Sequence, residues 1–148
     1  LQLPRVPGHE VAGVIAGESA GVAERGLDSY RRTAVESSSP VQLVVMLYDG
    51  ALRFCSDARG AILRRDVAAK GKALSKALAI VGELQATLDL ERGGDVATSL
   101  HQLYSFLTDR LLAASFSQSV EPLDQAVRVL TNLRDAWAGV GEQTAVPR

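Results

Sequence analysis

Few residues of this chain could act as a nucleophile or carry a proton in a reaction. Cys55 is its one cysteine, and His9 and His101 are its two histidines. A reactive thiolate needs a basic neighbour, but nothing in the sequence brings His101, on a separate predicted helix, toward Cys55. The sequence also lacks paired carboxylates, a nucleophile elbow and a phosphate-binding loop. We therefore predict no enzymatic activity, and interpret Cys55 as a small apolar core residue and His101 as an exposed helix residue.

One short segment suggests a metal site. Residues 7–10 (PGHE) resemble a stretch of zinc-dependent medium-chain dehydrogenases, in which a histidine and a glutamate lie near zinc. Such a site needs further ligands, including cysteine. Here Cys55 is the only cysteine, the chain is far too short, and no glycine-rich nucleotide loop follows a strand. We therefore predict no metal ion, cofactor or small-molecule substrate.

The composition favours packed helices. Apolar residues make up 47% of the 148 residues but aromatic residues only 5%, so Leu, Val and Ala must fill the core. A net charge of −1 gives no basic field for nucleic acid. The apolar run over 41–48 is much shorter than the ~20 residues that span a bilayer, and no basic secretory signal precedes it. These features, with a single cysteine, predict a cytoplasmic protein without membrane insertion.

The clearest helix start is at Ser39. Its hydroxyl can accept from the amide of Gln42, and the Gln42 side chain can reach back to the Ser39 amide. Pro40 occupies the first helical position, where its missing N–H costs nothing. Beyond it, apolar residues recur every three or four positions, the period of one helix face: Val44, Leu47, Ala51, Phe54, Ala58 and Ile62.

The same signals predict a second and a third helix. Asp66 can cap the second, which we expect to end at Gly93 and Gly94, because glycine readily adopts the positive φ of a helix end. Asp95 can then cap the third. The apolar faces are Leu74, Ala77, Val81, Leu84 and Leu88 in the second helix, and Val96, Leu100, Leu103, Leu107, Leu111 and Ala114 in the third.

A fourth helix follows the turn-like run 115–119. Pro122 suits its first turn, and we expect Gly139 and Gly141 to stop it. Its apolar face is Leu123, Val127, Leu130, Leu133 and Trp137, with Trp137 as the lid of the core and its N–H reaching a carbonyl or water.

Short connections make consecutive helices antiparallel. The predicted fold is therefore all-α, an up-down four-helix bundle over residues 30–140. Residues 1–29, which contain glycine and proline and show no periodicity, are predicted to form a flexible N-terminal arm. Residues 141–148 are predicted to form a C-terminal tail.

Several segments, in this order and spacing, resemble the FliS family of flagellin export chaperones. They are Tyr30, residues 39–51 (SPVQLVVMLYDGA), 72–77 (KALSKA), 88–97 (LDLERGGDVA), 103–104 (LY) and 133–137 (LRDAW). The resemblance covers about residues 27–138. It implies an antiparallel helical bundle that binds the C-terminal segment of flagellin in the cytoplasm, prevents premature polymerisation and delivers flagellin to the export gate, of which FlhA is part.

The chain departs from the family in two places. Ser115 and Ser119 stand where the family usually has Asn and Asp. Serine can still cap a helix, so the fold is not threatened, but any partner contact by those side chains is in doubt. Residues 1–26 also exceed the short arm expected of the family.

The resemblance implies two sets of contact residues. Leu27 and Tyr30 correspond to a region implicated in export-gate contact. The alternative is a hydrophobic staple that folds over the bundle. Both roles can hold in turn, with the N-terminal arm covering the flagellin groove until flagellin displaces it. The candidate flagellin groove is Leu43, Leu47, Tyr48, Leu52, Leu78 and Tyr104.

Alternatives remain open for these residues. Tyr48, Asp49 and Gly50 could make a partner contact and a close helix approach, or simply pack and carry a solvated carboxylate. Apolar residues beside the main stripes could line a groove, widen the core or form a homodimer seam: Val45, Leu52, Leu63, Leu78, Ile80, Leu112 and Val129. The alternative function is a self-associating structural bundle without a secretion substrate.

Overall fold

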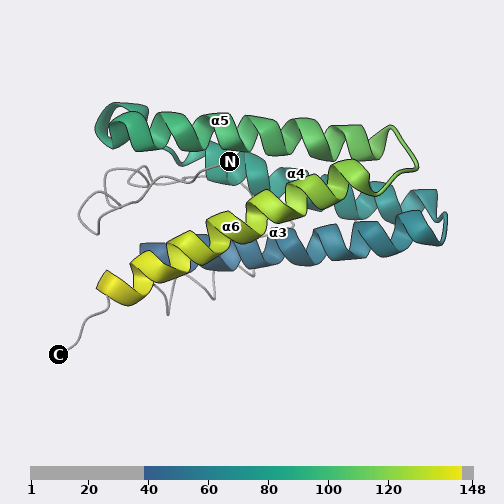
Figure 1. Cartoon of the computed structure of the whole chain (residues 1–148), viewed down its shortest axis with the longest axis horizontal. Helices are drawn as coiled ribbons and strands as arrows, with labels where there is room; N and C mark the ends of the chain where they lie inside the picture. The colour runs from purple at the N-terminus through teal and green to yellow at the C-terminus, as the bar shows by residue number, and fades with distance from the viewer. Residues whose placement is uncertain (1–38, 145–148) are drawn as a thin grey trace.

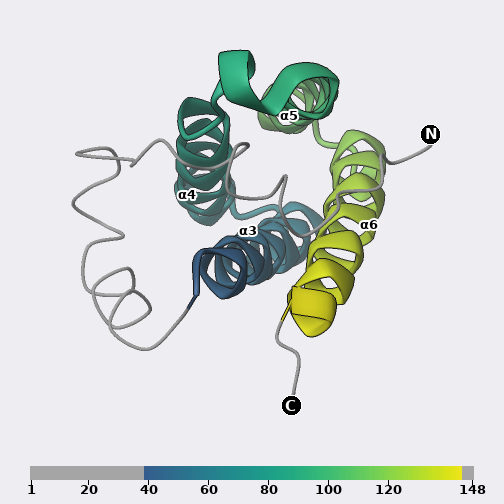
Figure 2. The same ribbon diagram turned by 90° about the vertical axis from the view of Figure 1, so that its left-hand side faces the viewer.

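The computed structural model describes the backbone of residues 39–144 and the side chains of residues 39–140. Four helices occupy this part: α3 (Pro40–Leu63), α4 (Val67–Ala86), α5 (Leu90–Ser115) and α6 (Glu121–Thr144). The α3–α4 and α5–α6 connections lie at one end of the molecule and the α4–α5 connection at the other, so consecutive helices are antiparallel (Figure 1). Viewed along the bundle, the helices surround one interior in chain order (Figure 2). The predicted all-α four-helix bundle is confirmed; residues 1–29, predicted as an arm, lie outside the described residues.

The predicted start of α3 is confirmed. The Gln42 amide donates to Ser39 Oγ at 3.1 Å, and the Ser39 amide donates to Gln42 Oε1 at 2.9 Å. Pro40 is the first helical residue. Two amides that have no partner within the helix are thus satisfied reciprocally, which makes this end of α3 readable from four consecutive residues.

The boundary between α4 and α5 differs from the prediction. Asp66 caps α4 as expected, but α4 ends at Ala86, and α5 begins at Leu90 with Asp89, not Asp95, as its cap. The Asp89 carboxylate accepts from the Arg92 amide at 3.0 Å, so the chain turns before the two glycines. Gly94, with φ of 56°, instead forms a break inside α5, where its lack of Cβ makes that conformation accessible.

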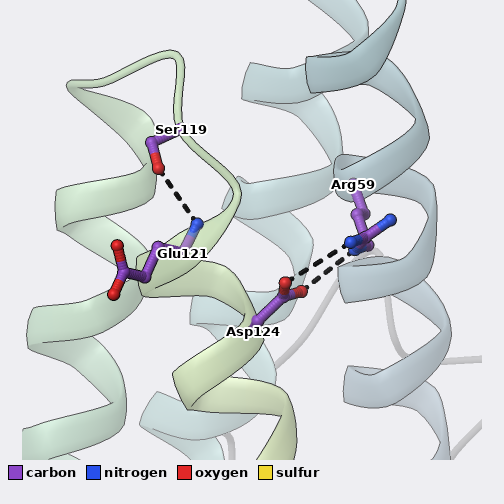
Figure 3. A network of polar contacts seen from close by, with 4 residues as sticks. All are labelled: Arg59, Ser119, Glu121 and Asp124. Atoms are coloured by element: carbon purple, nitrogen blue, oxygen red, sulfur yellow. Dashed lines mark hydrogen bonds and ion pairs between the residues drawn. The ribbon is translucent and has the colours of Figure 1, made fainter.

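The start of α6 agrees with the prediction and its end does not. Ser119 Oγ accepts from the Glu121 amide at 3.1 Å (Figure 3), so serine still caps here, and Pro122 lies in the first turn. However, α6 continues through Gly139 and Gly141 to Thr144. Glycine lowers helix propensity by about 1 kcal/mol but keeps its N–H, and it therefore need not end a helix that packs on a core.

The interior follows the predicted apolar faces with four exceptions, of which Val96 and Val127 are partly buried against the core. Phe54 is only partly buried, and the neighbouring Cys55 is fully buried in its place, as expected of a small apolar residue. Leu88, predicted on α4, lies partly buried in the α4–α5 connection. The remaining predicted core is buried on all four helices, for example Leu47, Leu74, Leu107 and Leu130.

A buried lysine joins the start of α4 to the α5–α6 connection. Lys70, in the first turn of α4, is only 4% exposed. Its Nζ donates to the Ser117 carbonyl, in the α5–α6 connection, at 2.8 Å. Because a buried ammonium is costly without a partner, this hydrogen bond ties the start of α4 to the end of α5.

Candidate partner-binding surfaces

Three of the six predicted groove residues lie in the interior. Leu47 and Tyr48 of α3 and Tyr104 of α5 are buried. The two tyrosine hydroxyls hydrogen-bond to each other across the bundle, and their ring centroids are 6.5 Å apart. In this structure they hold α3 to α5 and present no surface to a partner.

The buried phenols remain protonated over a wide pH range. Burial raises the pKa of Tyr48 well above its ordinary value, and Tyr104 beside it raises it further, while a side-chain hydrogen bond with Trp137 lowers it in part. Burial likewise raises the pKa of Tyr104. Trp137 is buried, as predicted for a core lid, and its side-chain partner is this phenol. The arrangement is an interior polar cluster that joins three helices.

A fourth predicted residue, Leu52, lies on the flank of α3 that faces α6. Three residues before it, Asp49 accepts from Arg134 of α6 at 2.8 Å. Seven residues after it, Arg59 donates to Asp124 of α6 at 3.0 Å (Figure 3). Residues spaced by three and seven share one side of a helix. Leu52 is partly buried against the core in this seam.

The last two predicted residues lie on other flanks. Leu43 is seven residues before Gly50, whose missing Cβ would meet Ile80 of α4 at 3.3 Å, so Leu43 faces the α3–α4 side. Leu78 is seven residues before Gln85, whose amide donates to two atoms of α5. The candidate residues are thus distributed over three different seams and the interior, and they do not form one groove.

An exposed apolar surface lies instead along α4 and α5. Leu112, on α5, is 42% exposed, and Phe116, the residue that follows α5, is 85% exposed one turn further along the chain. Leu112 lies seven residues after Ser105, to which Gln85 of α4 donates at 3.0 Å, so it occupies the flank toward α4. Together with the partly buried Leu78, these residues form what we call the apolar seam (Leu78, Leu112 and Phe116).

Other predicted residues can now be placed. Leu63 is exposed, like Leu112, whereas Ile80 and Val129 are buried and widen the core. Phe116 was not predicted as a site residue, although an aromatic residue in the turn-like run 115–119 was a usable signal for an exposed contact. Phe106 was missed as well, and is 41% exposed. Leu27 and Tyr30 lie outside the described residues, as does the segment 7–10.

The described residues contain no sign of reactive chemistry. Cys55 is buried, and burial raises the pKa of its thiol to about 12, so it is neutral near pH 7. His101 is exposed on α5, as predicted. Between residues 39 and 140 no group of three or more His, Cys, Asp or Glu side chains could hold a metal ion. None of α3, α4, α5 and α6 combines the length and apolar character needed to cross a membrane.

Comparison with known proteins gives a consistent result. A family model described as flagellar protein FliS matches residues 23–144, which include all four helices. The flagellar secretion chaperone FliS of Salmonella typhimurium is 38% identical over 125 residues, covering 81% of this chain and 93% of that protein. The flagellar secretion chaperone FliSB of Pseudomonas aeruginosa is 32% identical over 122 residues, covering 80% and 97%. The FliS protein of Bacillus subtilis is 32% identical over 109 residues, covering 74% and 80%.

Proposed function

The chain belongs to the FliS family of flagellar secretion chaperones, and on this premise we propose that it binds the C-terminal segment of flagellin in the cytoplasm. Its general role is that of a chaperone in flagellar export, not of an enzyme. In the proposal, binding keeps the flagellin segment from associating before export, and the complex is then delivered to FlhA at the export gate.

The observation that supports this proposal best is the apolar seam. Phe116 is 85% exposed and Leu112 42% exposed, and exposed apolar patches commonly mark protein interaction sites. Burying a large apolar side chain contributes about 1.5–3 kcal/mol, and ordering a disordered segment costs about 2–5 kcal/mol. Because Leu78 is already partly buried, Phe116 and Leu112 supply most of this gain, and an amphipathic segment laid along α4 and α5 needs further contacts to offset its ordering cost.

The predicted groove residues receive different roles in this proposal. Leu78 belongs to the apolar seam, and Leu43 and Leu52 provide further contacts for a segment long enough to wrap around the bundle. Leu47, Tyr48 and Tyr104 are buried, and in this proposal they pack in the core and do not contact the partner. Leu27 and Tyr30 are proposed, on the family resemblance, as contacts of the export gate.

Calorimetric titration with a peptide of flagellin's C-terminal segment tests the proposal. We expect one-to-one binding with a large negative heat-capacity change, because apolar surface is buried. Phe116→Ala should weaken binding at least about tenfold. Phe106→Ala is the matched control, because Phe106 is an exposed phenylalanine four residues before Arg110, which donates to Gln125 of α6 and so marks the opposite flank of α5.

Two results would contradict the proposal. One is no detectable complex although circular dichroism shows a folded bundle; the other is equal loss of affinity in both variants. Concentration-dependent mass in sedimentation, without flagellin binding, would support the alternative, a structural bundle that self-associates through the apolar seam.

A further inference from the structure

A second surface, between α3 and α4, has different chemistry from the apolar seam. A pocket of about 350 Å³ opens there, lined by residues of both helices. Small residues, among them Ala73, lie at its wall, and Phe54 of α3 is partly buried beside them. We call this surface the basic groove, and its defining side chains are Arg53, Phe54, Arg64, Lys72 and Lys76.

The cations of the basic groove outnumber its acids. Arg64, Lys72 and Lys76 line the pocket with Asp57 as the one carboxylate. Lys76 Nζ lies 5.4 Å from the centre of the Phe54 ring, and Arg53 Cζ lies 5.7 Å from it. Both cations are thus within the range in which an aromatic ring attracts a positive charge.

These cations lack strong acidic partners within the described residues. The ion pairs formed between residues 39 and 140 involve neither Arg53, Lys72 nor Lys76. Arg64 has only a long contact of 3.9 Å with Asp66. By contrast, Arg59 and Arg134, on the α6 side of the molecule, are each paired with a carboxylate at 3.0 Å or less. Arg65, in the α3–α4 connection, and Arg128, on α6, are also outside these ion pairs, but only the α3–α4 side brings several such cations to one pocket.

We propose that the basic groove binds an acidic segment of a partner protein. Lys72 and Lys76 are one helical turn, about 6 Å, apart along α4, a spacing that carboxylates one turn apart on a partner helix would match. Arg64, directly after the end of α3, can take a further carboxylate with two hydrogen bonds. The Phe54 ring offers an apolar face between these charges, where a leucine of the partner packs.

The same features disfavour other anions. A nucleic acid needs a wide basic face, but this chain has a net charge of −1, and these cations occupy a single seam. A small free anion gains little from exposed lysines, because water screens them. A peptide gains from several weak charge contacts and one apolar contact together.

The basic groove and the apolar seam are on different sides of α4. Gly50 and Ile80 mark the α3 side, and Gln85 marks the α5 side through its contacts with α5. The two surfaces share no residue. The inference therefore does not depend on flagellin binding at the apolar seam.

The test uses a fluorescein-labelled helical peptide with glutamates one turn apart and one central leucine. Anisotropy at low ionic strength should show saturable binding to the full chain. The double variant Lys72→Gln/Lys76→Gln should weaken it about tenfold, since exposed charge pairs are individually weak. The matched control is Arg128→Gln, because Arg128 is an exposed cation of α6 outside the groove, and it should leave affinity within about twofold.

Three outcomes would overturn the proposal. They are no saturable binding by the folded protein, equal loss in the groove and control variants, and equal competition by oligodeoxythymidine or by a peptide with Gln in place of Glu. Phe54→Leu, which keeps an apolar side chain but removes the ring, should weaken peptide binding without reducing flagellin binding. Loss of both would show a folding defect or a shared site, and would also contradict the proposal.

Discussion

Helix α3 meets its two neighbours in different ways. Toward α4 it presents Gly50, so close to Ile80 that a methyl group in place of the glycine hydrogen would lie 3.3 Å from the Ile80 Cδ1. Toward α6 it presents Asp49 and Arg59, which pair with Arg134 and Asp124. The α3–α4 contact therefore rests on close packing, and the α3–α6 contact includes ion pairs.

The difference shows which interactions determine each helix contact. The paired residues are ten positions apart on α3 and also ten apart on α6, in opposite chain directions, so the two ion pairs set the antiparallel register of these helices. They are half-exposed and add little stability. The α4 side is close-packed, and there a change of a few atoms is costly.

The largest loss of stability should come from removing a buried side chain at the α3–α4 contact. Ile80→Ala removes a buried side chain opposite Gly50, and we expect a loss of about 2–5 kcal/mol in the free energy of unfolding. Urea denaturation followed by circular dichroism measures it. A loss no larger than that of the exposed Leu63→Ala would show that this seam is not tightly packed.

The second-largest loss of stability should come from the buried face of α3, which carries Tyr48. Tyr48→Phe leaves the Tyr104 hydroxyl and the Trp137 indole without their buried partner, and we expect a loss of about 1–3 kcal/mol. The measurement is the same, with Tyr104→Phe for comparison. Unchanged stability in both variants would contradict the proposed interior cluster.

A further, smaller effect should appear at alkaline pH. The folded pKa of the Cys55 thiol, about 12, is above its ordinary value of 9.0. The stability that the folded state gains by keeping the Cys55 thiol protonated is therefore fully present below pH 9.0, and it is lost as pH rises toward 12. Between about pH 8 and about pH 10 the free energy of unfolding should fall about 1 kcal/mol more in the natural protein than in Cys55→Ala. Parallel pH profiles would refute buried-thiol linkage.

The smallest effect should come from the charged side. Arg134→Gln and Asp49→Asn, alone and combined, form a double-mutant cycle whose coupling should be weaker than each effect above and should disappear near 1 M salt, because salt screens exposed charges. Coupling that persists at high salt would mean that the pair is more buried than the structure indicates.

The elements specified by neighbouring residues could be predicted from the sequence. The Ser39–Gln42 capping box and the Asp66 cap involve residues three positions apart, and each helix start was correct there. The α4–α5 boundary was wrong because Asp89 and Asp95 both suit a helix cap. Local pattern alone does not decide which of two caps the packing uses.

The candidate site was harder to predict, because the spacing of apolar residues does not show which neighbouring helix each side of a helix faces. Tyr48 and Tyr104 stand out as family-like residues, yet both are buried. Leu43 and Leu52 are nine residues apart and therefore on opposite flanks of α3, since nine steps of about 100° leave them about 180° apart. Phe116 escaped notice because it lies in a turn, outside any helical stripe.

The hydrogen bond from Lys70 to Ser117 has a consequence for the order of assembly. The bundle consists of two helical hairpins, α3 with α4 and α5 with α6, and each can form from contacts close in sequence. The ammonium of Lys70 belongs to one hairpin and the carbonyl of Ser117 to the connection of the other. Either group loses hydration at a cost before its partner arrives, so this bond forms only once the two hairpins come together.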